Sequence, residues 1–304
     1  MLIYQEKDGF FFKLNTLAAL AYILAVFLLT LVLSNPLYLC GLFLAVAAVI
    51  VSADLTRKWR NYMKYSSALV LLILLVNVIF VRAGSTVIWR GPVLWGIGRL
   101  KITLEAFCFG MGMGIRMLII ISIFCLYTYA VNPDKVLKLI GRWNNKGVLT
   151  LTLSTRLFPL MVMDFQRIIE IQRCRGVRFE SVPWWRRIIK YFPVINIMLL
   201  SSLERSFQFA EAMHARGFGL TNRSYYNREL WRPRDNIITC TVLLSIFIGV
   251  LLLISGKADY SYYPVLQPLK RGDLITAVIL SMLYMTPALL NWGWKKWLLL
   301  KARI

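Results

Sequence analysis

Long uncharged stretches alternate with basic segments along the chain. The uncharged or nearly uncharged runs cover residues 17–34, 36–53, 65–81, 102–131, 237–255 and 274–294. At a rise of about 1.5 Å per residue, each run is long enough, or nearly so, to cross a hydrocarbon core of about 30 Å as a helix. The pattern therefore predicts an all-α polytopic membrane protein with about six transmembrane helices.

A more polar segment, residues 132–236, separates the fourth run from the fifth. It predicts three parts: an N-terminal membrane domain over 1–131 with about four spans, a cytoplasmic domain over 132–236, and a C-terminal membrane segment over 237–304 with about two spans. Apolar residues within 132–236 recur every three or four positions, which predicts two long amphipathic helices. They are Leu149, Leu153, Leu157, Leu160, Met161, Phe165, Ile168 and Ile171, and then Ile188, Phe192, Ile195, Leu199, Leu203, Phe207 and Ala210.

Charge indicates the orientation and the class of partner. The chain has 36 Lys and Arg against 14 Asp and Glu, yet 59% of its residues are hydrophobic. A chain this apolar is expected in a bilayer, so its basic excess favours anionic lipid headgroups and acidic protein partners over nucleic acid. Lys and Arg flank the predicted spans mostly on the side of both termini and of residues 132–236. This bias predicts a multi-pass protein of the cell membrane with both termini in the cytoplasm, and the outer loop 82–101 is a basic exception.

Two similar segments occur within the polar part. "EIQRCRGVRF" begins at Glu170 and "EAMHARGFGL" at Glu211, and in both a Glu is followed after four residues by Arg-Gly. A Phe-Pro pair precedes each, at Pro159 and Pro193. Gly176 and Gly217 stand where a helix needs a left-handed residue to stop, and an Arg before the stop suits the negative end of a helix dipole. Each Arg-Gly is thus either a capped helix end or, because guanidinium pairs with carboxylates, a docking point for a partner.

These segments resemble the paired Ala-Arg-Gly signatures of the transmembrane T component of energy-coupling factor (ECF) transporters, the EcfT/CbiQ family. Further similar stretches are Arg156-Leu157-Phe158-Pro159, Asn77 in "LLVNVIF" and "TYAVNPDKVLKLI" after the fourth run. One departure is Cys174, where the first signature normally has Ala.

The resemblance implies a non-catalytic coupling subunit of an ABC importer for vitamins or metal ions. It implies two ABC ATPases as partners, as a homo- or heterodimer, and a membrane-embedded S component that binds the substrate. Two coupling helices would dock on the ATPases through their Arg-Gly ends. The residues expected at this contact are Arg175 and Arg216, Gly176 and Gly217, Cys174 and Ala215, and the apolar Val177, Met213 and Phe218. The sequence has no GxxxxGK[ST] loop, so ATP is expected on another chain.

Other residues carry weaker signals. Gly110, Gly112 and Gly114 indicate close helix packing or a contact with the S component, and Pro159 and Pro193 belong to the same group. Glu105 and Arg116 are ionisable groups within the fourth run, where such groups are functional hypotheses by default. His214 has no Ser or Cys nucleophile in a supporting motif, and the five cysteines lack metal-ligand spacing. No cofactor or metal is expected.

Two other classes remain as alternatives. One is an integral-membrane enzyme acting on a lipid or phosphorylated substrate, although the acids of 132–236 are too scattered for a metal cluster. The other is a secondary transporter, although the two membrane portions show no matching halves.

Overall fold

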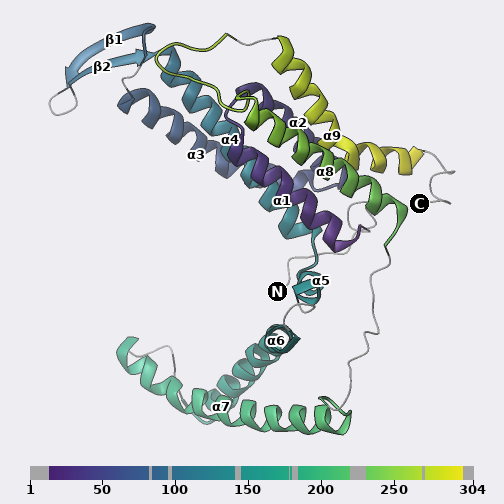
Figure 1. The fold of residues 1–304 in the computed structure, drawn as a ribbon. Coiled ribbons are helices and arrows are strands. Elements are labelled where there is room, and N and C mark those ends of the chain that lie inside the picture. The colour runs from purple at the N-terminus through teal and green to yellow at the C-terminus, as the bar shows by residue number, and fades with distance from the viewer. Residues whose placement is uncertain are drawn as a thin grey trace. The chain divides into compact units, whose positions relative to one another are not determined.

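The computed structural model describes residues 14–81, 84–94, 98–140, 145–177, 179, 184–219, 231–268 and 271–296. Within these ranges the chain forms long helices and a two-stranded sheet (Figure 1). It divides into two compact units, which we describe separately. The membrane unit lies within residues 2–136 and 230–304, and the helix-pair unit lies within residues 137–229.

The membrane unit contains a helix for every predicted span. These are α1 (Thr16–Val32), α2 (Pro36–Ser52), α3 (Thr56–Phe80), α4 (Leu104–Ala130), α8 (Pro233–Ile254) and α9 (Arg271–Lys296), and the short α5 (Pro133–Ile140) follows α4. The helices α3, α4, α8 and α9 are long and apolar enough to cross a bilayer, whereas α1 and α2 are shorter apolar helices. The prediction of an all-α polytopic membrane protein is confirmed.

Asparagine caps define where α1 and α2 begin. The side chain of Asn15 accepts a hydrogen bond from the backbone N–H of Leu17, and that of Asn35 accepts one from Leu37. Such caps satisfy N–H groups that have no partner within the helix. Pro36 occupies the first turn of α2, where its missing N–H costs nothing. Two closely spaced helices therefore form on either side of a three-residue connection, 33–35.

The helices of the membrane unit pack in a definite order. The helix α4 contacts α3 on one side and α1 and α2 on the other, while α1 contacts α8 and α2 contacts α9. Tyr22 of α1 donates a hydrogen bond to the backbone oxygen of Tyr284 in α9 (2.9 Å), and Ser245 of α8 donates one to the Tyr284 hydroxyl (2.7 Å). Because all these groups are buried, each hydrogen bond offsets the cost of removing polar atoms from water.

The three glycines of α4 lie at close contacts within the membrane unit. A β-carbon on Gly114 would lie 2.8 Å from a methyl group of Val70, and one on Gly110 would lie 3.4 Å from a backbone carbon of α3. A β-carbon on Gly112 would lie 2.7 Å from the hydroxyl of Tyr262. These glycines therefore allow α3 and the segment around Tyr262 to approach α4, and their contact with an S component stays a prediction.

A β-hairpin stands where the sequence predicts only an outer loop. Strand β1 (Val87–Leu94) pairs antiparallel with β2 (Gly98–Thr103), and the register places Arg90 opposite Lys101. Gly91 and Pro92 interrupt the strand pattern of β1, and the ladder is irregular at this point. Since Pro and Gly are uncommon inside strands, the pattern did not indicate this hairpin.

Glu105 fixes the chain that leads into the hairpin. Its Oε1 atom accepts hydrogen bonds from the backbone N–H and hydroxyl of Ser85 and from the backbone N–H and hydroxyl of Thr86, at 2.6–3.2 Å. Glu105 also lies in the first turn of α4, where a carboxylate is favoured by the helix dipole. This contact network gives the buried acid a structural role at the helix start.

The helix-pair unit is built from α6 (Asn145–Cys174) and α7 (Trp184–Ala215). The ring of Tyr191 on α7 stacks on Phe165 of α6 (6.1 Å between centroids) and on Phe179 (4.9 Å). Both helices match the predicted amphipathic segments, and Pro159 and Pro193 lie inside them.

Much of the apolar surface of this pair remains exposed. The exposed side chains include Phe158, Leu160, Met163, Ile188, Ile189, Phe192, Leu199, Leu200, Leu203 and Phe207. Residues Gly147–Cys174 of α6 also have the length and hydropathy of a membrane span, with the lowest mean hydropathy, 1.3, of five such helices in the described chain. The location of residues 132–236 in the cytoplasm therefore stays a prediction.

Candidate functional site: two matched helix ends

The helix α6 ends in a complete Schellman motif. The N–H of Gly176 donates to the carbonyl of Arg173 (3.0 Å), and the N–H of Val177 donates to the carbonyl of Gln172 (3.0 Å). Gly176 has a φ of +88°, in the left-handed region that glycine adopts without strain. Arg175 is thereby the last residue before the reversal of the chain, and it is exposed.

The helix α7 ends in the same way. The N–H of Gly217 donates to the carbonyl of His214 (2.9 Å), and the N–H of Phe218 donates to the carbonyl of Met213 (3.0 Å). Gly217 has a φ of +72°. The predicted helix stops at both glycines are therefore confirmed, and Arg216 holds the same backbone position in α7 as Arg175 does in α6.

The residues expected at the ATPase contact gather at these two ends. Exposed or partly exposed side chains there belong to Arg175, Arg216, Cys174, Ala215, Val177, Met213 and Phe218. Each end thus presents a guanidinium beside an apolar side chain, a combination suited to a carboxylate within an apolar groove. His214 lies exposed on the last turn of α7, where its carbonyl serves the cap.

A salt bridge joins the two helices at equivalent positions of the repeat. Asp164 precedes Arg175 by 11 residues, and Arg205 precedes Arg216 by the same 11. Their side chains pair across α6 and α7 with an N–O distance of 2.5 Å. The sequence patterns did not indicate this pair, although aligning the two segments further upstream from Arg-Gly brings Asp164 and Arg205 into register.

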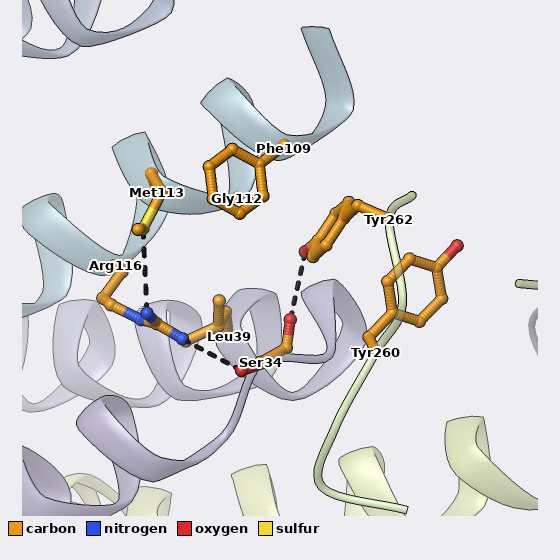
Figure 2. Close-up of a pocket in the computed structure, with 8 residues that line it drawn as sticks. All are labelled: Ser34, Leu39, Phe109, Gly112, Met113, Arg116, Tyr260 and Tyr262. Atoms are coloured by element: carbon orange, nitrogen blue, oxygen red, sulfur yellow. Dashed lines mark hydrogen bonds between the residues drawn. The ribbon is translucent and has the colours of Figure 1, made fainter. Parts of the chain in front are cut away.

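Arg116 occupies a separate position inside the membrane unit. Its guanidinium donates to the carbonyl of Leu33 (2.9 Å), which is the C-cap of α1, and lies near the hydroxyl of Ser34. The Tyr262 hydroxyl donates to the carbonyl of Ser34 (3.0 Å), so the connection 33–35 is held from two sides (Figure 2). A cation at the C-terminal end of α1 is favoured by the helix dipole, which gives Arg116 a structural role.

A small pocket adjoins Arg116. It has a volume of about 90 Å³ and is lined by Ser34, Leu39, Phe109, Gly112, Met113, Arg116, Tyr260 and Tyr262 (Figure 2). Burial, and then the neighbouring Tyr260, raise the pKa of Tyr262 to about 12, so its hydroxyl is neutral and can donate. In the part of the chain that the structure describes, no cluster of His, Cys, Asp and Glu is suited to a metal ion.

Comparison with known proteins gives consistent matches. Residues 10–226 match the protein family described as CbiQ, cobalt transport protein. The chain is 33% identical over 174 residues to the energy-coupling factor transporter transmembrane protein EcfT of Streptococcus thermophilus, covering 54% of this chain and 65% of that protein. It is 30% identical over 195 residues to EcfT of Listeria innocua (60% and 70% covered), and 27% identical over 250 residues to EcfT of Streptococcus equi (78% and 87% covered).

The fold and the matched helix ends define a polytopic α-helical membrane protein that carries a pair of long helices terminated alike. Because the family match covers most of the sequence, the chain belongs to the EcfT/CbiQ family. The names of its relatives describe transmembrane components of transporters. The chain is accordingly a non-catalytic transport component, as predicted, and the alternative of a membrane enzyme is set aside.

Proposed function

We propose that the chain is the transmembrane coupling (T) subunit of an ECF-type ABC importer. It would link two ABC ATPases to a membrane-embedded S component that binds a vitamin or a metal ion. Both termini and the helix-pair unit would lie in the cytoplasm, in accordance with the bias of Lys and Arg around the spans. The matched Schellman endings of α6 and α7, each with an Arg before the glycine, are the observation that carries this proposal.

The two arginines would each pair with a carboxylate on one ATPase. Each guanidinium follows a helix whose last carbonyls are satisfied by the Schellman bonds, so the arginine itself is available to a partner. Gly176 has no other atom within 4 Å of the place of a β-carbon, which leaves room for a partner surface. Two equal endings suit two equal or related ATPases, because each presents the same chemistry.

Coupling would be mechanical. When the ATPases close on ATP, the two docked helix ends would move relative to each other. The contacts between α6 and α7, including the Asp164–Arg205 pair, would transmit this motion through the helix pair. The exposed apolar faces of both helices would provide the surface on which the S component rests, since large exposed apolar patches mark interaction sites. The substrate itself would be selected by the S component.

The experiment that tests this function is co-purification from detergent. The chain is co-expressed with candidate ABC ATPases and an S component, and the bound ATPase is quantified for the unchanged protein and for Arg175→Ala with Arg216→Ala. Removing a hydrogen-bonded charge from an interface costs about 2 to 5 kcal/mol, so the double variant should lose most of its ATPase or should uncouple ATP hydrolysis from uptake.

A matched control removes the same charge from the same helix. Arg167 is exposed on α6, eight residues before Arg175, and Arg167→Ala should leave ATPase binding unchanged where Arg175→Ala alone reduces it. If the control and the signature variant release the ATPase equally, general charge governs binding. If neither releases it and uptake continues, the two Arg-Gly ends are ordinary helix caps and the docking role is refuted.

A further inference from the structure

The start of α3 carries an exposed row of cations. Arg57, Arg60 and Lys64 are spaced by three and four residues, which places them on one face of the helix, and all three are exposed. The sequence contains no acidic residue between Asp54 and Glu105. We call these three residues the basic stripe. Positive charge is therefore concentrated along α3, and the nearest acid in sequence is Asp54, which precedes the helix.

The opposite face of the same helix segment is fixed against the rest of the unit. The indole N–H of Trp59 donates to the hydroxyl of Ser122 in α4 (2.9 Å). The ammonium of Lys58 lies over the ring of Tyr129, 4.1 Å from its centroid. These contacts orient the first turns of α3, and they leave the basic stripe directed away from α4.

The length of α3 places the basic stripe at the level of lipid headgroups. Its 25 residues extend over about 37 Å at a rise of about 1.5 Å each, which exceeds a hydrocarbon core of about 30 Å. The uncharged part of α3 begins at Tyr65, whose side chain is 77% exposed, as is typical of aromatic residues at the membrane interface. The excess of about 7 Å corresponds to about five residues, so Arg57 and Arg60 extend beyond the core, and the long side chain of Lys64, one turn further along, can reach the headgroups from there.

The surroundings of α3 favour lipid over protein as the partner of this face. The helix lies at the edge of the membrane unit, and Ser66 is its one buried residue. Its exposed apolar residues, among them Leu71, Leu72 and Phe80, suit acyl chains. The basic stripe continues this surface at one end, where headgroups follow acyl chains in a bilayer.

We propose that the basic stripe binds the phosphate groups of anionic phospholipids. Guanidinium and ammonium groups donate hydrogen bonds to phosphodiester oxygens, and Arg does so with two donors at once. Because the stripe is rigidly oriented by Trp59 and Lys58, it would hold headgroups at one fixed place on the protein rather than attract them at large. This site is independent of the Arg-Gly ends.

The test uses the full chain in phosphatidylcholine vesicles that contain a trace of spin-labelled phosphatidylglycerol or spin-labelled phosphatidylcholine. Electron paramagnetic resonance measures the fraction of each label that the protein immobilises. Arg60→Gln with Lys64→Gln should reduce the preference for phosphatidylglycerol by about fivefold for each cation removed, because one Lys or Arg near an anionic surface contributes about 1 kcal/mol. High salt should reduce the preference of the unchanged protein as well.

The control pair is Lys257→Gln with Arg271→Gln, two exposed cations elsewhere in the membrane unit, which should retain the preference. All four positions are exposed, so the fold should persist, and circular dichroism verifies this. Equal losses in both pairs would show a general effect of charge and overturn the site. An unchanged preference in the Arg60 and Lys64 variant would also overturn it, and loss of ATPase co-purification in that variant would assign the stripe to a protein contact instead.

Discussion

Substitutions that remove the salt bridge between Asp164 and Arg205 should weaken the packing of α6 against α7. The two side chains are 28% and 27% exposed in the Arg205–Asp164 pair, and their charged atoms lie 2.5 Å apart. At an effective dielectric constant of about 20, unit charges about 4 Å apart attract by about 4 kcal/mol before solvation and entropy are counted. Ion pairs with this degree of exposure contribute at most about 1 kcal/mol in net terms. We therefore expect the equilibrium between packed and separated α6 and α7 to shift about fivefold toward the separated state, and we expect both helices to stay folded.

The assay measures the distance between the two helix ends. Nitroxide labels are attached to Cys174 and to Ala215→Cys after the other cysteines are replaced by alanine, and double electron–electron resonance gives the distribution of distances. Asp164→Asn and Arg205→Gln should each broaden this distribution. The exchanged pair, Asp164→Arg with Arg205→Asp, should restore the narrow distribution, because it re-creates the attraction with the charges reversed.

Two results would refute this reasoning. If the single variants keep the narrow distribution, the ring contact of Phe165 with Tyr191 holds the helices without help from the ion pair. If the singles broaden it and the exchanged pair does not narrow it, the loss comes from altered packing at these positions and not from charge. The ion pair and the ring contact could both be required to hold the helices together. The double variant Phe165→Leu with Asp164→Asn tests this, because its distance distribution should then be broader than that of Asp164→Asn alone.

Two further predictions concern local structure. Gly176→Ala and Gly217→Ala should each destabilise their helix end by about 1 to 2 kcal/mol, since a β-carbon in the left-handed conformation is strained; faster amide hydrogen exchange at Val177 and Phe218 would show this, and unchanged exchange would contradict it. Glu105→Ala should expose the backbone N–H of Thr86 to exchange, because Oε1 is its acceptor, whereas protection equal to that of the unchanged protein would mean that the hairpin alone orders this segment.

Features that depend on neighbours in sequence could be predicted from the sequence. Hydrophobic runs gave the positions of the membrane helices, since a span must be apolar along its whole length. The helix ends at Gly176 and Gly217 could also be predicted from neighbouring residues, because a Schellman motif requires a left-handed residue within one turn of the helix end. The helix boundaries differ from the runs where charged turns extend a helix beyond the apolar part, as in α3, which begins at Thr56 and not at Tyr65.

Features that depend on distant partners could not be predicted. The guanidinium of Arg116 donates to the carbonyl of Leu33, 83 residues away, and the backbone N–H of Asn15 donates to the carboxylate of Asp235, 220 residues away. No periodicity indicates such pairs. The sequence therefore marked Glu105 and Arg116 as unusual charged residues in an apolar run, but it did not indicate their hydrogen-bond partners. The hairpin was missed for a related reason: its ladder is formed by pairing between two irregular strands, and neither strand alternates clearly.

The repeat links these two kinds of feature. Its Arg-Gly ends are local and were visible in the sequence, whereas the Asp164–Arg205 contact is distant, yet both obey the same offset of 41 positions between α6 and α7. Over 11 residues at about 1.5 Å each, Arg175 and Arg216 extend about 16 Å along their helices beyond the paired side chains. If either helix rotated about that contact by a given angle, its terminal arginine would therefore move by a similar distance. Under the proposed function, equal distances of this kind would make the two helix ends move by similar amounts when the ATPases close. If Arg175→Ala and Arg216→Ala reduced the amount of bound ATPase unequally, the two ends would not be mechanically equivalent.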